Sequence, residues 1–89
     1  MRKEQLLFSN LAKQPNSVLI IDDSAQNILF LQEVLSDIAT IYFATNGQDG
    51  LALSEQLQPS LILLDIEMPQ LDGWQVCRQL KDNAKTRDI

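Results

Sequence analysis

Two runs of four apolar residues stand out in the chain, and each of them ends at an acidic residue. Val18–Ile21 leads into the pair Asp22-Asp23, and Leu61–Leu64 leads into Asp65. A short continuous apolar run bounded by loop residues is typical of a strand that is covered on both faces. Thr40–Ala44 has strand composition and is too short for a helix. The pattern therefore predicts three strands.

Helical patterns fill the segments between and after these strands. The first begins at Ser24, where either Asp23 or Ser24 is suited to cap it. The second covers Gln48–Gln58, and the third covers Trp74–Asn83. Apolar residues recur in them at helical spacing. The residues predicted to face inward are Ile28, Leu31, Leu35 and Ile38, then Leu51, Ala52 and Leu57, then Val76, Cys77 and Leu80.

Two other features of the pattern concern helix quality and the chain ends. Gly50 lies inside the second predicted helix and is expected to be a mild defect, costing up to about 1 kcal/mol relative to alanine. Residues 1–16 place Leu7, Phe8 and Leu11 on one face before Pro15. This predicts an N-terminal helical extension that packs on the domain or on another copy. The polar residues 84–89 predict a frayed end or a turn.

The order strand, helix, strand, helix, strand, helix predicts an α/β fold with a parallel sheet and right-handed crossovers. We expect an incomplete, flavodoxin-like, doubly wound sheet of the form βαβαβα. In that arrangement the strand order is 2-1-3, so the first and third strands are neighbours. The carboxyl ends of parallel strands share one edge, where ligand sites of open α/β sheets lie. Asp22, Asp23 and Asp65 are therefore predicted to meet in one crevice.

Three carboxylates in one crevice need compensation for their charge. Two carboxylates about 4 Å apart repel by about 4 kcal/mol at an effective dielectric constant of about 20. An oxygen-only cluster with open positions suits Mg²⁺, which keeps several waters and accepts phosphate oxygens. One acid of the Asp22-Asp23 pair could instead only cap the following helix. That alternative does not account for Asp65.

Composition narrows the possible functions. The 89 residues allow one small domain. The net charge of −5, without any histidine, argues against a nucleic-acid partner. The single Cys77 cannot form an internal disulfide, which fits a reducing cytoplasm. With one cysteine and no histidine, the sequence cannot assemble a zinc site of ordinary composition. No apolar run approaches the roughly 20 residues of a membrane span, so no membrane insertion is expected.

Taken together, the two acid-terminated strands and the segment Ile66–Gly73, with its Met68-Pro69 and Asp72-Gly73, resemble the receiver domains of two-component response regulators. The resemblance runs from about residue 17 to residue 89. It implies that Asp65 accepts a phosphoryl group from a phosphohistidine on a histidine kinase or histidine phosphotransfer protein. It also implies that Mg²⁺ or Mn²⁺ is held by Asp23, Asp65 and the main-chain carbonyl of Glu67, with Asp22 helping through water. Such a domain is a signalling module and not itself an enzyme.

The family pattern continues with two further strands, which carry a Ser or Thr and a Lys directed at the phosphoryl group. The sequence ends at Ile89, where the fourth strand would begin, so residues 17–89 are expected to be the N-terminal part of a receiver. We therefore expect metal binding to persist and phosphorylation to be weak. An uncovered third strand predicts a homo-oligomer formed by strand pairing or domain swapping. The alternative is a truncated receiver that acts only as an interaction or oligomerisation module.

Two enzyme classes are alternatives to a receiver domain, and the sequence departs from the pattern of each. Asp65-Ile66-Glu67 is similar to the double-acid motif of haloacid-dehalogenase-type phosphohydrolases. Those enzymes normally carry the nucleophile on the first strand with a second Asp two residues later, whereas the first strand here ends in adjacent acids. A P-loop ATPase needs a glycine-rich loop with Gly-Lys-Ser/Thr, and the sequence has none.

Overall fold

The computed structural model describes residues 16–89 and contains the six elements that the sequence predicts, in the predicted order. The predicted helix within residues 1–16 lies outside the described residues. Most boundaries agree with the sequence analysis to within one residue. The elements are β1 (Ser17–Ile21), α2 (Ala25–Leu35), β2 (Thr40–Ala44), α3 (Gly47–Leu57), β3 (Leu61–Leu64) and α4 (Gly73–Asp82).

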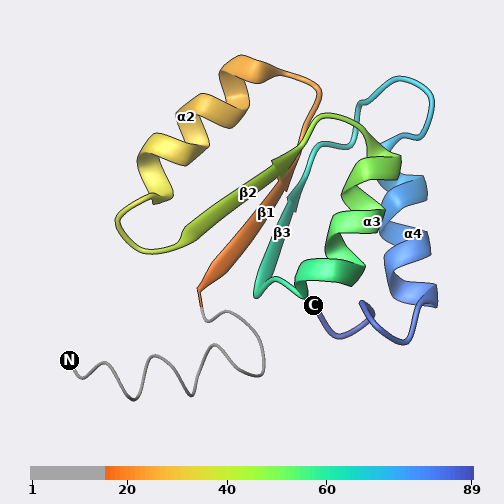
Figure 1. The fold of residues 1–89 in the computed structure, drawn as a ribbon. Coiled ribbons are helices and arrows are strands. Elements are labelled where there is room, and N and C mark those ends of the chain that lie inside the picture. Colours follow the sequence, from red (N-terminus) through yellow and green to blue (C-terminus); the bar gives the residue numbers. More distant parts are fainter. Residues whose placement is uncertain (1–15) are drawn as a thin grey trace, which may run out of the picture.

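The three strands form a parallel sheet in the order β2-β1-β3, as predicted. In the register of the sheet, Ile21 at the end of β1 lies beside Ala44 of β2 and Leu64 of β3. Helix α2 lies on one side of the sheet, and α3 and α4 lie together on the other (Figure 1). The carboxyl ends of all three strands consequently meet at one edge.

The central strand β1 supplies the centre of the core, because both of its faces are covered. All five of its residues are buried, and Leu19, Ile20 and Ile21 are at most 1% exposed. Leu19 and Ile21 pack on the α3 and α4 side with Val76 and Leu80. Val18 and Ile20 pack on the α2 side with Ile28. The prediction of a strand buried on both faces is confirmed.

Helix α2 is shorter than its apolar pattern suggested. Ile28 is buried and Leu31 and Leu35 pack against the same cluster, as predicted, but Ile38 is 67% exposed. The helix ends at Leu35 with Ser36 as its C-cap, and the N–H of Ile38 turns back to the carbonyl of Leu35. Ile38 thus lies in the turn before β2, and its assignment to the helix was wrong.

Helix α3 corrects two expectations about packing. Leu51 and Leu53 pack against the core, whereas Ala52 is exposed. Gly50 is buried, and a Cβ atom built there would lie 2.5 Å from Cδ1 and 2.9 Å from Cγ2 of Ile21. Gly50 is therefore more than a defect in the helix: it costs helix propensity, but it permits the close approach of α3 to β1.

The C-terminal residues form a turn that is fixed to α4. Thr86 is 1% exposed, and its hydroxyl donates to the carbonyl of Leu80 at 2.7 Å. The Lys81 ammonium donates to the carbonyls of Arg87 and Ile89 at 3.0 and 3.2 Å. Of the two alternatives for residues 84–89, the turn is confirmed.

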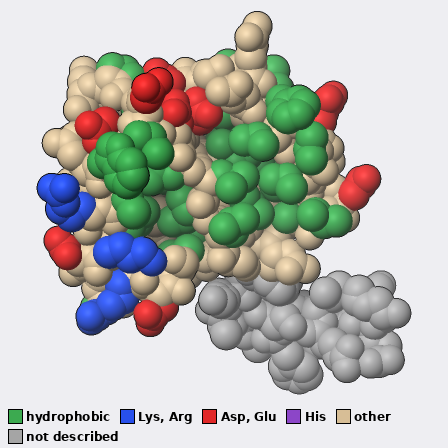
Figure 2. Space-filling view, turned by 180° about the vertical axis from the view of Figure 1, so that it is seen from behind, with side chains coloured by type: hydrophobic (Ala, Val, Ile, Leu, Met, Phe, Trp, Pro, Cys, Tyr) green, Lys and Arg blue, Asp and Glu red, His purple; other side chains and the backbone are tan. Residues whose placement is uncertain are grey.

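One helix on one side of the sheet leaves more apolar surface there than two helices leave on the other. Figure 2 shows hydrophobic side chains gathered over the half of the molecule that holds α2. Large exposed hydrophobic residues on α2 and the sheet are Leu29, Phe30, Val34, Phe43 and Leu61. Among the described residues, no helix has both the length and the apolar character that crossing a bilayer requires.

The contact of Gly50 with Ile21 generates the first prediction. Gly50→Ala should destabilise the protein by about 1–2 kcal/mol, because overpacking a buried contact outweighs the gain of about 1 kcal/mol in helix propensity. Urea unfolding followed by circular dichroism measures this. Gln48→Ala, at an exposed position of the same helix, is the control and should be neutral or slightly stabilising. A stabilising Gly50→Ala would show that the backbone approach is not tight.

Candidate functional site

The carboxyl ends of β1 and β3 carry the three candidate acids. Asp22 and Asp23 follow Ile21, and Asp65 follows Leu64. Because Ile21 and Leu64 are partners in the parallel register, the next residues of both strands leave the sheet side by side. The ladder extends one step further, since the N–H of Asp65 donates to the carbonyl of Ile21 at 2.9 Å.

The structure brings Asp22, Asp23 and Asp65 together. One carboxylate oxygen from each lies within 4.8 Å of the other two. Asp22 is only 8% exposed, Asp65 is half-buried, and Asp23 is exposed. The cluster therefore has one buried, one intermediate and one solvent-facing carboxylate, an arrangement with access from solvent.

Asp22 is the most constrained of the three carboxylates. Its Oδ1 accepts a hydrogen bond from the main-chain N–H of Ser24 at 2.9 Å, and its Oδ2 accepts one from the Asn27 side-chain amide at 3.3 Å. Ser24 is also the N-cap of α2, as the sequence analysis allowed, and its hydroxyl accepts from the Asn27 N–H. Sequence reasoning missed Asn27, whose only signal was an amide in the first turn of the helix.

Asp65 is less constrained. Its Oδ1 accepts a hydrogen bond from the main-chain N–H of Glu67 at 3.1 Å. No residue of the described range 16–89 donates to its Oδ2 or to the carboxylate of Asp23. These oxygens are available for a ligand. The Glu67 side chain is exposed, and the role of the Glu67 carbonyl as a metal ligand stays a prediction.

The loop after Asp65 is held in place by the burial of Met68 and by the close approach that Gly73 permits. Met68 is 7% exposed and packs with the core residues Leu19 and Val76, so it anchors the loop in addition to preceding Pro69. Gly73 has no positive φ. A Cβ atom there would instead collide with the main-chain carbonyl of Asp65. Gly73 thus lets the start of α4 lie against the backbone of the candidate acceptor.

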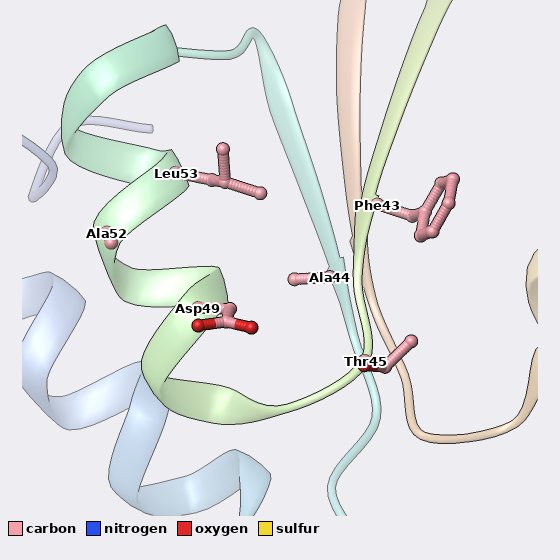
Figure 3. Close-up of a pocket in the computed structure, with 6 residues that line it drawn as sticks. All are labelled: Phe43, Ala44, Thr45, Asp49, Ala52 and Leu53. Carbon is pink, nitrogen blue, oxygen red and sulfur yellow. The ribbon is translucent and has the colours of Figure 1, made fainter.

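The surroundings of the cluster are apolar on the α2 side. A hollow of about 230 Å³ is lined by Asp22 and Asp65 together with Ile20, Leu31, Leu63 and Leu64. A larger depression of about 450 Å³ lies between the outer edge of β2 and α3 (Figure 3). It shares no lining residue with the acidic cluster. Its single acid, Asp49, accepts a hydrogen bond from the Asn46 side-chain amide.

No basic side chain of the described part compensates the three acids. Its four basic residues all lie on α4 or in the turn after it: Arg78, Lys81, Lys85 and Arg87. Lys81 is held by the carbonyls of Arg87 and Ile89, and Lys85 lies 3.9 Å from Glu55. Carboxylate oxygens are the ligands that Mg²⁺ and Mn²⁺ prefer, so the donor set fits a hard divalent cation.

Comparison with known sequences agrees with this geometry. The family profile described as the response regulator receiver domain matches residues 18–89. Protein PilH of Pseudomonas aeruginosa is 41% identical over 73 residues, which cover 81% of this chain and 60% of PilH. A protein-glutamate methylesterase/protein-glutamine glutaminase of Symbiobacterium thermophilum is 43% identical over 82 residues. The match covers 89% of this chain and 23% of that protein, so the chain spans less than a quarter of that relative.

Solved structures give the same result. The N-terminal domain of a response regulator receiver protein from Methanoculleus marisnigri superposes with a TM-score of 0.79 at 31% identity, covering 82% of this chain and 60% of that one. The signal receiver domain of a histidine kinase from Syntrophus aciditrophicus also gives 0.79, at 29% identity, with 84% and 58% covered. Parallel strands in the order 2-1-3, three acids at their shared edge and the matched profile lead to one conclusion: this chain belongs to the response regulator receiver domain family.

Proposed function

We propose that Asp65 is the phosphoryl acceptor of this receiver and takes its phosphoryl group from a phosphohistidine with the help of Mg²⁺ or Mn²⁺. Receiver domains work in two-component signalling together with histidine kinases or phosphotransfer proteins. The observation that carries the proposal is the meeting of Asp22, Asp23 and Asp65 within 4.8 Å. Asp65 is the half-buried acid of the cluster, and no residue among 16–89 donates a hydrogen bond to its Oδ2. We further propose a cytoplasmic location, in keeping with the single free Cys77.

In this mechanism Asp65 accepts the phosphoryl group, and the acids of the cluster hold the cation. Glu67 N–H donates to Oδ1 of Asp65, so Oδ2 would be the oxygen that attacks phosphorus. The new bond joins Oδ2 to phosphorus while the bond from phosphorus to the histidine nitrogen breaks. The electron pair of the broken bond stays on that nitrogen, and because the other ring nitrogen carries a proton, the leaving group is a neutral imidazole. Asp23 and Asp65 would hold the cation, with Asp22 behind them. When bound, the cation neutralises charge on the phosphoryl oxygens and orients them.

Phosphorylation should depend on Asp65 and on the cation. With acetyl phosphate and Mg²⁺, we expect a mass increase of one phosphoryl group on a minor fraction of the chain, because both lysines of the described part are held elsewhere. Asp65→Asn and chelation by EDTA should each abolish it. Intact-mass spectrometry gives the measurement, and Asp49→Asn is the control for an acid outside the cluster. Labelling that survives in Asp65→Asn would refute the assignment, and stable stoichiometric labelling would refute the expected weakness.

Metal binding can be tested separately from phosphorylation. Mg²⁺ at ten times its dissociation constant should stabilise the fold by about 1.4 kcal/mol, seen as a rise in melting temperature. Asp23→Asn should remove that rise and should slightly raise the melting temperature in EDTA, because it relieves repulsion within the cluster. Asp49→Asn should keep the Mg²⁺ effect. Equal Mg²⁺ effects in wild type and Asp23→Asn would place the cation elsewhere.

We also propose that a second copy of the chain pairs with β3. This strand lies at one edge of the sheet, and Leu61 is 49% exposed. Apolar hollows flank it on both faces, one of about 230 Å³ that includes Leu63 and one of about 240 Å³ that includes Ile62 and Cys77. An edge strand without polar residues is a template for strand pairing.

Light scattering at micromolar concentration should therefore report a dimer or a larger assembly. Leu61→Lys should shift it towards the monomer, because a lysine on an edge strand opposes pairing. Phe43→Lys, on the opposite edge strand β2 and of similar exposure, is the matched control and should leave the assembly intact. A wild-type monomer, or equal effects of both variants, would exclude assembly through β3.

A further inference from the structure

We infer that Asn27 is a positioning residue of the acidic site: its side-chain amide holds the carboxylate of Asp22 in the orientation that cation binding requires. The inference rests on the proposed metal site. The contact that motivates it joins Asn27 Nδ2 to Asp22 Oδ2 at 3.3 Å. Together with the Ser24 N–H on Oδ1, it gives both oxygens of this buried carboxylate a donor from the first turn of α2 or its cap.

The caps of α3 and α4 show what the third residue of a helix does elsewhere in this fold. Asn27 is the third residue of α2, as Asp49 is of α3 and Gln75 is of α4. The Asp49 carboxylate bonds to the side chain of its own N-cap, Asn46, at 2.9 Å. The Gln75 side chain accepts from the N–H of its own N-cap, Asp72, at 3.0 Å. Both side chains complete their own helix cap.

Asn27 departs from this arrangement. Its main-chain N–H takes part in the cap by donating to Ser24 Oγ at 3.2 Å, but its side chain turns to Asp22 outside the helix. The N-cap N–H of Ser24, which a capping box would give to residue 27, goes to Asp22 as well. In α4 the third helical residue accepts the hydrogen bond from the N-cap N–H. In α2 Asp22 accepts that hydrogen bond instead, and the Asn27 side chain donates to Asp22.

The Asn27 amide is neutral, and this suits a position beside three carboxylates. The first helical turn favours acidic side chains, because they interact favourably with the helix dipole. α3 follows that preference with Asp49, whereas the first turns of α2 and α4 contain no acid. An Asp at position 27 would place a fourth carboxylate against a cluster of three. An amide donates to Asp22 without adding charge, so it can orient the carboxylate and leave the cluster able to hold a cation.

This positioning role makes a quantitative prediction for metal affinity. Groups that orient metal ligands typically change affinity by about tenfold or more when they are removed. Asn27→Leu, which keeps the size and removes the donor, should raise the dissociation constant of Mn²⁺ about tenfold. Isothermal titration calorimetry of the 89-residue chain with Mn²⁺ gives the measurement.

Gln75→Ala is the matched control, because it also removes a side-chain contact at the third residue of a helix. It should lower the melting temperature in EDTA while changing the Mn²⁺ dissociation constant by less than about twofold. A merely structural role of Asn27 would give the same result for Asn27→Leu, and the inference would then be wrong. If the wild type bound no Mn²⁺ at all, the proposed metal site would fail first.

Asn27→Asp provides an independent check on the contact with Asp22. Without metal, it should lower the melting temperature, because the new carboxylate faces Asp22. With Mn²⁺, the rise in melting temperature should fall short of that of the wild type, because the variant lacks the amide donor that orients Asp22. An Mn²⁺ effect equal to that of the wild type, with an unchanged melting temperature in EDTA, would show that residue 27 does not face Asp22 in solution.

Discussion

The parallel pairing of β1 with β3 is the constraint on which the site depends. Ile21 and Leu64 are register partners, so the acids that follow them must leave the sheet at the same edge. Carboxylate charges that lie within 4.8 Å of one another repel by at least about 3.5 kcal/mol per pair at an effective dielectric constant of about 20. Burial of Leu19, Ile20 and Ile21 opposes this with about 1.5–3 kcal/mol per side chain. The acids meet because the strands beneath them pair in this register. A shift by one residue would exchange the side chains that pack on the two faces of the sheet.

Helices α3 and α4 and the loop after Asp65 pack closely against this edge of the sheet. Gly50 brings α3 against Ile21, and Gly73 brings the start of α4 against the carbonyl of Asp65. Met68 fixes the intervening loop in the core. A side chain at position 50 would press on Ile21, the neighbour of Asp22, and one at position 73 would collide with the backbone of Asp65. Packing and site geometry are coupled here, so a substitution that disturbs the core near β1 is expected to disturb the acids as well.

The sequence predicted the strands well, because a run such as Leu61–Leu64 ending in an acid has few alternative structures. It also predicted that Asp22, Asp23 and Asp65 would meet, which follows from topology. Ile38 was misplaced because helical periodicity does not mark where a helix stops, and Ser36 ends α2 first. The role of Gly50 depends on the distance to Ile21, a residue far away in sequence. Contacts of that kind are set by packing and leave no periodic signal.

The Asn27 side chain does not follow the capping pattern of the other helices, and it lies beside the acidic cluster. A helix considered alone would use its third residue to complete the cap, as α3 and α4 do. α2 instead directs that side chain to Asp22, at a position where an acid would have favoured the helix and burdened the cluster. The helix still has Ser24 as its N-cap, so it forms even though the Asn27 side chain donates to Asp22 and does not accept from the cap. The cap of α2 does not require this contact, since Ser24 and the Asn27 N–H complete it, and the proposed positioning role gives the contact a reason.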